Sequence, residues 1–494
     1  MTYIYPATVL CDFYKISHRE QYPPKTQKIY STWTPRTSRI KNVNRVVFFG
    51  LQAFIKKYLQ EYFDTYFFNR PLEDVIAEYK RVIKNTLGVE PDTKHIEALH
   101  KLGYLPLRIK AVKEGTRVPI RVPMMTIENT HPDFFWLTNY IETLLSCSLW
   151  QPCTSATIAY QYRKLLRGYA ASTGGSLDFV QFQGHDFSMR GMSSLETVKG
   201  SAAAHLLSFV GTDSIPGILF LEEYYGANIE KELVGTSIPA TEHSVMCAYG
   251  QNELESYKRI ITEVYPNGFV SIVSDTWDLW NVLRNVIAPL KDDIIAREGK
   301  VVIRPDSGDP IKIICGDEQS SNPDARKGVM EILWEIFGGK INEKGFKELD
   351  PHIGCIYGDA ITYDRCFEIS QTLMDKGFAS TNMVYGIGSY TYQYNTRDTF
   401  GFALKSTYAR IDGQELSLFK NPITDSGIKK SQSGMVSVLN TEQGIVYTDR
   451  LIEEDRNTFE GVDLLEDVFV DGVLEREQTL ADIRNIIKEY DTDK

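Results

Sequence analysis

The sequence predicts an α/β protein whose middle part is a β/α barrel, with a second domain formed by the two ends of the chain. From about residue 178, short β-branched or aromatic runs end at Gly or Asp, and each is followed by a segment of helical periodicity. This alternation is typical of parallel β/α units. Polar side chains recur just past the ends of these runs, where a β/α barrel places its active site. We therefore favour a barrel over a doubly wound sheet.

Six runs are expected to form the strands of the barrel. They are residues 179–182, 236–238, 269–273, 301–303, 353–357 and 382–385. We assign residues 151–400 to the barrel, and residues 1–150 and 401–494 to the N-terminal and C-terminal parts of the second domain. The chain is longer than a single hydrophobic core usually supports, which agrees with two domains.

Local signals mark several turns and helix ends. Asp412-Gly413 and Asp471-Gly472 have the composition of tight hairpin corners, because both positions of such a turn need a positive φ. Residues 193–196 predict a capping box, in which a serine hydroxyl and the carboxylate of Glu196 satisfy free backbone amides at the start of a helix.

Composition excludes several classes of protein. The chain has 494 residues, of which 43% are hydrophobic and 24% are charged, as in ordinary folded proteins. Its formal net charge of -11, without a cluster of Lys or Arg, argues against nucleic-acid binding. Small anionic ligands remain compatible with this charge, because a few arginines that converge in a cleft outweigh it locally.

The cysteine pattern and the hydropathy predict a cytoplasmic protein. The seven cysteines are scattered and include no C-x-x-C pair, which fits a reducing compartment. The N-terminus lacks a basic segment followed by an apolar stretch, and nowhere do 18 apolar residues run together. We expect neither export by a standard signal nor a membrane span.

Three aspartates follow predicted strands and are candidates for a shared site. Asp275, Asp306 and Asp359 could together bind a divalent cation or the hydroxyl groups of a sugar. Each one alone is better explained as the N-cap of the next helix. Their recurrence at the same topological position favours a functional role for the set.

Arginines and glycines beside these positions suit a phosphate. Arg190, Arg304 and Arg397 lie next to Gly or Asp, and their planar guanidinium groups match phosphate oxygens, although structural salt bridges explain them about equally well. Gly388 and Ser389 follow a predicted strand, where backbone amides can approach a phosphate. Glycines after strands also simply make turns.

A histidine and two aromatic residues complete the candidate set. His243 follows Glu242, which could orient the imidazole as it accepts a proton or a phosphoryl group. Phe187 and Tyr14 offer flat surfaces for a ring ligand. For each of these residues a purely structural role is the commoner explanation.

Taken together, these motifs resemble those of the nicotinamide phosphoribosyltransferases, over nearly the whole chain. The motifs that carry the resemblance are Asp12-Phe13-Tyr14-Lys15, Gln21-Tyr22-Pro23-Pro24, His185-Asp186-Phe187 with Arg190-Gly191, Gly211-Thr212-Asp213, Glu242-His243, Ser274-Asp275, Arg304-Pro305-Asp306, Gly358-Asp359 and Thr396-Arg397-Asp398. The resemblance implies a type II phosphoribosyltransferase: an irregular β/α barrel with a second, mostly β domain, acting as a homodimer whose active sites lie at the subunit interface. The implied reaction joins nicotinamide to the ribose of phosphoribosyl pyrophosphate and releases pyrophosphate.

The resemblance also assigns roles to residues. Phe187 and Tyr14 of the partner subunit would stack on the two faces of the pyridine ring, and Asp213 would accept a hydrogen bond from its carboxamide. The other substrate-binding positions are Arg190, His243 and Arg304 for pyrophosphate, Asp306, Gly358 and Asp359 for ribose, Gly388, Ser389 and Arg397 for the 5'-phosphate, and Arg36 and Lys420 for phosphates across the dimer.

Cofactors follow from the same resemblance. Mg²⁺ is expected mainly on the pyrophosphate, with Asp275 and Asp306 as protein ligands, and catalysis would then be mostly positioning and electrostatic stabilisation. ATP is expected as a co-substrate that phosphorylates His243, with Glu242 supporting the imidazole, and this step would favour product formation. The Asp213 carboxylate would repel the carboxylate of nicotinate, and such a like-charge contact costs on the order of several kcal/mol of binding free energy. Nicotinamide is therefore the expected substrate.

Some features depart from the family pattern, and other functions compete. Ser389 stands where better-known members have glycine, and Gln183 where they have lysine. The nearest rival is a nicotinate phosphoribosyltransferase, which Asp213 disfavours. A sugar-phosphate aldolase or isomerase would need a Schiff-base lysine or a base at a strand end, and a binding-only barrel would not need the full set of catalytic-type residues.

Overall fold

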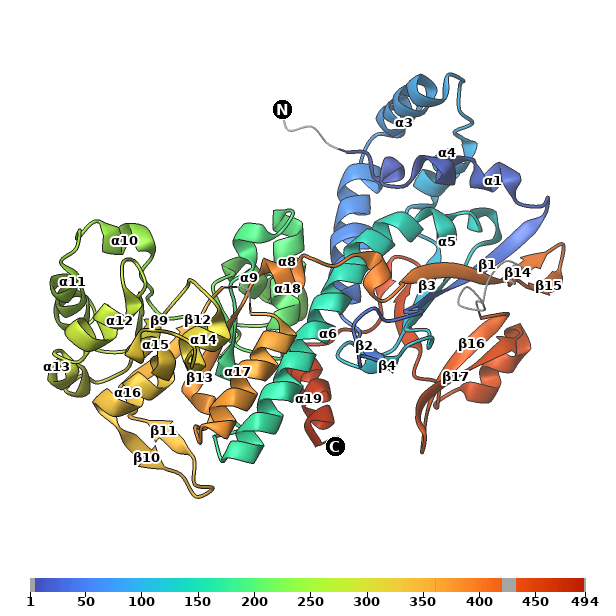
Figure 1. Cartoon of the computed structure of the whole chain (residues 1–494). Helices are drawn as coiled ribbons and strands as arrows, with labels where there is room; N and C mark the ends of the chain where they lie inside the picture. Colours follow the sequence, from blue (N-terminus) through green and yellow to red (C-terminus); the bar gives the residue numbers. More distant parts are fainter. Residues whose placement is uncertain (1–4, 360, 420–431, 493–494) are drawn as a thin grey trace. The chain divides into compact units, whose positions relative to one another are not determined.

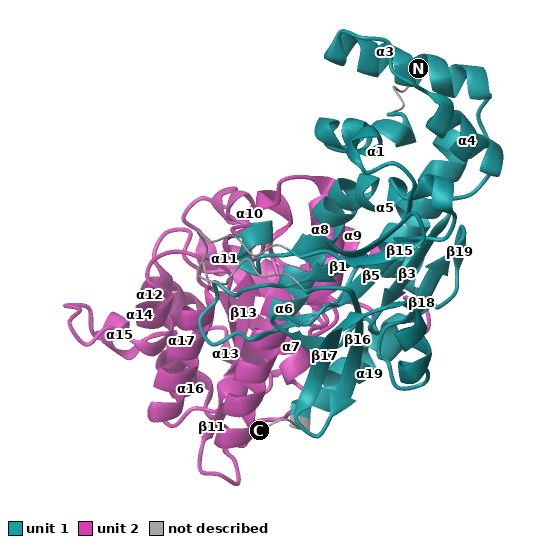
Figure 2. Cartoon of the chain, turned by 90° about the vertical axis from the view of Figure 1, so that its right-hand side faces the viewer, with its two compact units in different colours: residues 1–157, 221–227, 395–494 teal, residues 158–220, 228–394 magenta. Residues whose placement is uncertain are grey.

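The computed structural model describes residues 5–359, 361–419 and 432–492, and it is a mixed α/β structure (Figure 1). Its internal contacts divide the chain into two compact units. Unit 1 contains residues 1–157, 221–227 and 395–494, and unit 2 contains residues 158–220 and 228–394 (Figure 2). The expected domain boundaries near residues 150 and 400 stay a prediction.

A curled parallel sheet forms the centre of unit 2. Its six strands run in the order β7-β6-β13-β12-β9-β8. They are β6 Gly184–Asp186, β7 Gly211–Thr212, β8 Val270–Val273, β9 Val301–Arg304, β12 Ile353–Tyr357 and β13 Met383–Ile387. All five residues of β12 and all four of β8 are buried, as expected for a parallel sheet covered by helices.

A segment without regular strand structure connects the two edge strands of this sheet. Thr236 forms a parallel bridge with Gly211 of β7, and Ala240 forms one with Ser271 of β8. The backbone N–H of Thr212 donates to Thr236 at 2.9 Å, and that of Ser271 donates to Pro239 at 2.8 Å. Residues 236–240 therefore hydrogen-bond to β7 on one side and to β8 on the other.

Helices follow most strands of unit 2. They are α7 Val180–Gln183, α8 Leu195–His205, α10 His243–Cys247, α11 Glu253–Arg259, α12 Leu279–Asn281, α13 Lys291–Ile295, α14 Pro310–Cys315, α15 Pro323–Lys327, α16 Val329–Phe337, α17 Tyr363–Asp375 and α18 Ser389–Tyr392, with a small hairpin of β10 Gly339–Ile341 and β11 Lys347–Leu349. In α17 the buried positions Cys366, Ile369 and Leu373 recur at helical spacing, so one face of the helix packs inward.

Unit 1 is built on an antiparallel sheet of order β15-β14-β1-β5-β3-β18-β19. Its strands are β1 Thr26–Thr34, β3 Leu107–Ala111, β5 Met125–Asn129, β14 Ala403–Ile411, β15 Gln414–Ser417, β18 Glu466–Val470 and β19 Val473–Leu474, and the two further pairs are β2 Arg45–Val47 with β4 Arg117–Pro119 and β16 Met435–Thr441 with β17 Gly444–Leu451. The helices are α1 His18–Gln21, α2 Leu51–Phe54, α3 Leu72–Leu87, α4 Lys94–Leu102, α5 Leu137–Tyr140 and α19 Leu480–Glu489, while α6 Glu142–Thr173 and α9 Ile215–Tyr225 pass from one unit into the other.

Both predicted hairpin corners are confirmed. Asp412 and Gly413 join β14 to β15 with φ of 50° and 78°, and Asp471 and Gly472 join β18 to β19 with φ of 49° and 87°. Positive φ at both central residues is the turn whose twist matches that of the flanking strands. The short side chain of Asp and the absence of one in Gly tolerate this conformation.

Three local predictions were wrong. The expected strand at residues 236–238 is not formed, because Thr236 makes only an isolated bridge to Gly211. Residues 180–183 form helix α7 and the strand begins only at Gly184, because an apolar run of four residues does not distinguish a buried helical turn from a strand. The capping box at α8 pairs Ser194 with Thr197, not with Glu196. The helix begins one residue later than predicted, so the third helical position is Thr197, whose hydroxyl accepts from the Ser194 N–H at 3.0 Å.

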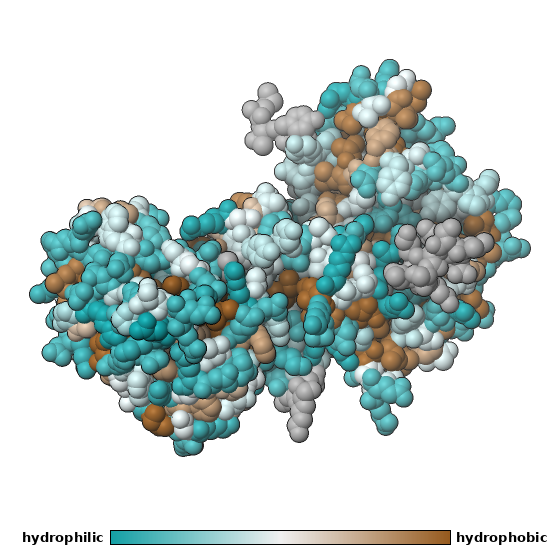
Figure 3. Space-filling view, in the orientation of Figure 1, coloured by the Kyte–Doolittle hydropathy of each residue, from teal (hydrophilic) through white to brown (hydrophobic). Residues whose placement is uncertain are grey.

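No helix in the described part of the chain is both long and apolar enough to cross a membrane. The face drawn in Figure 3 is largely hydrophilic, with smaller hydrophobic areas between.

Candidate active site

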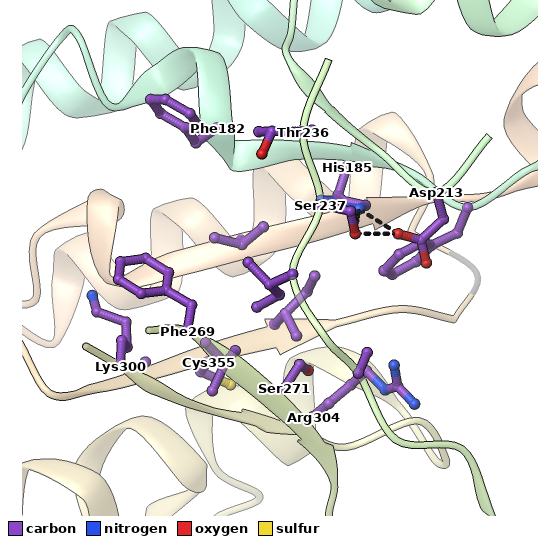
Figure 4. Close-up of a pocket in the computed structure, with 18 of the residues that line it drawn as sticks. Phe182, His185, Asp213, Thr236, Ser237, Phe269, Ser271, Lys300, Arg304 and Cys355 are labelled. Atoms are coloured by element: carbon purple, nitrogen blue, oxygen red, sulfur yellow. Dashed lines mark hydrogen bonds and ion pairs between the residues drawn. The ribbon is translucent and has the colours of Figure 1, made fainter. Parts of the chain in front are cut away.

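A cavity lies inside the parallel sheet of unit 2. The space within the cavity and its solvent-open mouth together is about 880 Å³. Arg304 at the end of β9 and Lys300 just before β9 both line it, so it extends along the whole strand. Phe179, Phe182 and Phe269 make much of its wall apolar (Figure 4). This is the combination of an apolar enclosure with a few polar groups that small-molecule sites use.

The polar corner of the cavity is centred on Asp213, directly after β7. The His185 Nε2 lies 2.9 Å from Asp213 Oδ1, and the Ser237 hydroxyl donates to the same oxygen at 2.6 Å (Figure 4). Burial raises the pKa of Asp213, but the hydrogen bonds from His185 and Ser237 and the charge of Arg304 outweigh it, so the pKa lies below its ordinary value. Asp213 is therefore a carboxylate at neutral pH.

Arg304 connects this corner to the other carboxylates. Its guanidinium donates to the backbone carbonyl of Thr241. Burial lowers the pKa of Arg304, while the negative charges of Asp306, Asp213 and Asp275 raise it. An arginine keeps its charge under such shifts. Arg304 thus presents a fixed positive charge among three carboxylates at the carboxyl end of β9.

His243 and Asp275 form an acid–imidazole pair. The His243 Nε2 lies 3.3 Å from Asp275 Oδ1, and the backbone N–H of Asp306 donates to Asp275 Oδ2 at 2.8 Å. Burial raises the pKa of Asp275, but hydrogen bonds from Ser307, Asp306 and His243 lower it more. The imidazole itself is 45% exposed, so a ligand can reach it.

The recorded partner of His243 is thus Asp275, not Glu242. Glu242 is the N-cap position of α10 and accepts a hydrogen bond from the Ser244 hydroxyl. The sequence suggested Glu242 because it is adjacent in the chain, whereas Asp275 follows β8, the next segment in space. The role expected for Glu242 stays a prediction.

Phe187 lies against glycine backbone. A Cβ atom at Gly386 would come within 2.4 Å of the Phe187 Cδ2, and one at Gly358 would lie 3.2 Å from its Cε2 and 3.4 Å from Asp306 Oδ1. The two glycines therefore let the ring pack flat beside Asp306. Because Phe187 is only partly buried, the ring retains a surface open to the cavity.

Asp359 belongs to the same neighbourhood. The phenol of Tyr357, at the end of β12, donates to Gly308 at 3.0 Å. Burial and the charges of Asp359, Asp275 and Asp306 raise the pKa of this phenol, in that order. All three aspartates that the sequence singled out thus lie near enough to one tyrosine to affect its pKa.

Ser389 begins α18, with Gly388 as its N-cap residue. A Cβ atom at Gly191 would come within 2.0 Å of the Ser389 Oγ, so the serine hydroxyl packs directly on the Gly191 backbone. Arg190 precedes that glycine and is exposed. Arg190, Gly388 and Ser389 are therefore close neighbours within unit 2.

Tyr14, Arg36 and Arg397 belong to unit 1. Tyr14 is 55% exposed, so it is not a core residue. Burial and the neighbouring Arg397 lower the pKa of Arg36, and burial together with the charges of both arginines lowers the pKa of Lys405. These three cations form a cluster with one another. Lys420, the other expected phosphate ligand, lies outside the described residues.

The described residues contain no group of three or more His, Cys, Asp or Glu side chains that could hold a metal ion. Asp275 uses one oxygen for His243 and the other for the Asp306 N–H. Asp275 and Asp306 thus do not make a protein metal cage on their own.

Sequence reasoning missed three residues of these clusters. His185 and Ser237 contact Asp213, and Lys405 joins Arg36 and Arg397. His185 belonged to a recognised motif without a role of its own. Ser237 lies inside the predicted strand 236–238, unlike the chosen aspartates, and a single serine within such a run does not stand out.

Comparison with known proteins gives consistent matches along the chain. Residues 182–473 match the model of the nicotinate phosphoribosyltransferase (NAPRTase) family, and residues 7–108 match that of the nicotinamide phosphoribosyltransferase N-terminal domain. A nicotinamide phosphoribosyltransferase of Acinetobacter baylyi is 50% identical over 487 residues, covering 96% of this chain and 95% of the relative. One from Mycoplasma pneumoniae is 37% identical, covering 84% of this chain and 92% of the relative.

Solved structures agree on the fold. A nicotinate-nucleotide pyrophosphorylase from Pyrococcus furiosus aligns with a TM-score of 0.58 at 16% identity, covering 98% of this chain and 95% of that chain. The human nicotinic acid phosphoribosyltransferase aligns with a TM-score of 0.52 at 13% identity, covering 97% of this chain and 93% of that chain. At these identities the likeness concerns the fold alone.

Proposed function

This chain belongs to the nicotinate phosphoribosyltransferase family and is a phosphoribosyltransferase, and from that premise we propose that it transfers the phosphoribosyl group of phosphoribosyl pyrophosphate to nicotinamide. The products are nicotinamide mononucleotide and pyrophosphate, as in NAD salvage. The observation that carries the choice of nicotinamide is the Asp213 carboxylate in the cavity, whose pKa is lowered. A carboxamide N–H can donate to this anion, whereas the carboxylate of nicotinate would be repelled.

In the proposed reaction, catalysis consists of positioning and electrostatic stabilisation. Breaking the bond between the anomeric carbon and pyrophosphate builds positive charge on the ribose and negative charge on the leaving group. Arg190, His243 and Arg304 would hold the pyrophosphate. Asp306, Gly358 and Asp359 would hold the ribose hydroxyls, and the Phe187 ring would support the pyridine.

Magnesium and ATP belong to this proposal. Mg²⁺ would arrive mainly on the pyrophosphate oxygens, since the described residues lack a cage for it, and it would neutralise leaving-group charge. Phosphorylation of the His243 imidazole by ATP would place a negative group next to the pyrophosphate position. The partial exposure of His243 supports this part of the proposal.

The finer fold and the assembly are also proposed. The hydrogen bonds of residues 236–240 to both edge strands support an irregular closed barrel, and the antiparallel sheet of unit 1 supports a second, mostly β domain made from both ends of the chain. We further propose a homodimer, in which Tyr14 of one subunit covers the pyridine of the other while Arg36, Arg397 and Lys420 reach phosphate groups. The exposure of Tyr14 supports its part in this arrangement.

The direct test is an assay of the purified protein with nicotinamide, phosphoribosyl pyrophosphate and Mg²⁺, with and without ATP. The proposal predicts that nicotinamide mononucleotide forms without ATP, and that ATP shifts the reaction toward product. The same assay is run with nicotinate in place of nicotinamide. A protein that forms a mononucleotide from nicotinate but not from nicotinamide would contradict the substrate assignment.

A further inference from the structure

Asp213 is held by two side chains that come from its two neighbouring strand segments. His185 lies in β6 and pairs with Gly211 in β7, while Thr236, the residue before Ser237, bridges to the same Gly211 on the other side. Asp213 follows β7 directly, so it leaves the sheet between its two partners. The parallel register places His185 opposite Gly211 and Ser237 one residue further along, so both partners lie within two residues of the level of Asp213.

Both partners bind the same carboxylate oxygen. The His185 Nε2–H and the Ser237 hydroxyl donate to Asp213 Oδ1, at 2.9 and 2.6 Å, and both dashed lines in Figure 4 meet there. Within the described part of the chain, Oδ2 has no recorded hydrogen-bond partner. The Asp213 side chain is 47% exposed and lines the cavity, so Oδ2 is the oxygen left for a ligand.

The His185 ring has little freedom to turn away. A Cβ atom at Gly211 would lie 2.8 Å from the His185 Nδ1, so one edge of the ring rests on the glycine backbone. The other ring nitrogen, Nε2, faces Asp213. The His185 side chain is only 12% exposed. An imidazole confined in this way keeps its donor aimed at one oxygen.

We propose that His185 and Ser237 are positioning residues for pyridine selection, which fix the Asp213 carboxylate with Oδ2 directed at the carboxamide N–H of nicotinamide. This inference rests on the proposed function and adds two residues to it. Without the two donors, the carboxylate can rotate and takes up a proton more readily. It then recognises the amide less well and repels an acid group less strongly.

The test compares alanine variants with conservative variants at both positions. His185→Ala and Ser237→Ala each remove one donor, whereas His185→Gln and Ser237→Thr keep an N–H or O–H near the same place. Ser320→Ala is the control, because this serine hydroxyl accepts a hydrogen bond from the Asn322 N–H but does not line the cavity. For each variant, KM and kcat are measured for nicotinamide, nicotinate and phosphoribosyl pyrophosphate, together with the thermal unfolding midpoint.

Each alanine variant should raise the KM for nicotinamide and lower the preference for nicotinamide over nicotinate, both by about tenfold, the size expected for one hydrogen bond to a charged group. The KM for phosphoribosyl pyrophosphate should stay within about twofold. The conservative variants should recover most of the preference, and Ser320→Ala should keep it. Gly211→Ala, which displaces the His185 ring without removing it, should act in the same direction as His185→Ala.

An equal rise in the KM for nicotinamide and in the KM for nicotinate would overturn the inference, because it would indicate a general disruption of the pyridine site. A preference that stays within twofold of wild type in both alanine variants would overturn it as well. If His185→Ala is unstable, the exposed Ser237 decides the question. A wild-type protein that does not use nicotinamide would contradict the proposed function itself, whereas an active wild type with indifferent variants would contradict only this inference.

Discussion

Asp275 joins His243 to the loop that carries Asp306: one of its carboxylate oxygens lies 3.3 Å from the His243 Nε2, and the other accepts the Asp306 N–H at 2.8 Å. Its side chain is only 8% exposed, while that of the imidazole is 45% exposed. A buried anion therefore orients a histidine that ligands can reach. This is the arrangement that sets the tautomer and the orientation of an imidazole.

Replacing this anion should weaken catalysis. Asp275→Asn keeps the volume, but it removes the charge, and its amide cannot accept from both His243 and the Asp306 N–H in the same way. We expect kcat/KM for phosphoribosyl pyrophosphate to fall by about ten- to hundredfold, since hydrogen bonds to charged groups contribute about 1.5–3 kcal/mol. Any stimulation by ATP should be lost as well, which steady-state assays with and without ATP will measure.

Glu242→Gln provides the comparison for Asp275→Asn. Its recorded contact is with Ser244 and not with the imidazole, so activity should stay within about threefold. A larger loss in Glu242→Gln than in Asp275→Asn would show that Glu242 is the effective partner of His243.

One added methyl group tests whether the position of the Phe187 ring matters for nicotinamide binding. In Gly386→Ala the new Cβ would come within 2.4 Å of the ring and 2.6 Å of the Gly358 Cα, so Phe187 and the adjoining backbone must move. The KM for nicotinamide should rise about tenfold, because overpacking of this kind costs about 1–3 kcal/mol. Gly168→Ala in α6 is the control, since its Cβ meets nothing within 4 Å. Equal kinetics for the two variants would contradict the role of Phe187.

A buried histidine in unit 1 predicts loss of stability in mild acid. His95 is 7% exposed, its Nδ1 is buried without a recorded partner, and burial lowers its pKa to about 4. The folded state therefore binds this proton less readily than the unfolded state, whose histidine pKa is about 6.5. Stability is complete above pH 6.5 and falls as the pH drops toward 4, by about 1.4 kcal/mol per pH unit.

The measurement is the thermal unfolding midpoint at pH 7 and at pH 5, for wild type and for His95→Phe. The phenyl ring retains the edge contact with Trp136, whose centroid lies 4.9 Å away, but it does not titrate. The drop in midpoint between the two pH values should be smaller in the variant. Equal drops in both proteins would mean that His95 does not contribute to the acid sensitivity.

Local chemistry and buried runs made parts of the fold predictable. The Asp-Gly corners follow from positive φ at two adjacent positions, and the strands near residues 301 and 353 follow from uninterrupted buried runs. The strand β7 was missed because two residues are too few to show an alternating pattern. Residues 179–182 were assigned to a strand although most of them are helical.

Sequence patterns indicated the positions of the candidate aspartates but not their contacts. Asp275, Asp306 and Asp359 each stand two residues past a strand, as predicted. The pairs His185–Asp213 and His243–Asp275 depend on which strands become neighbours in the sheet and on their register, and no local pattern encodes these.

The most direct measurement of the central claim is a competition experiment. The protein is given equimolar nicotinamide and nicotinate with phosphoribosyl pyrophosphate, and both mononucleotides are quantified for wild type and for Asp213→Asn. The Asp213 carboxylate predicts that wild type makes mostly nicotinamide mononucleotide and that the variant makes both. A wild-type protein that makes mainly nicotinate mononucleotide, or a variant with unaltered selectivity, would contradict it.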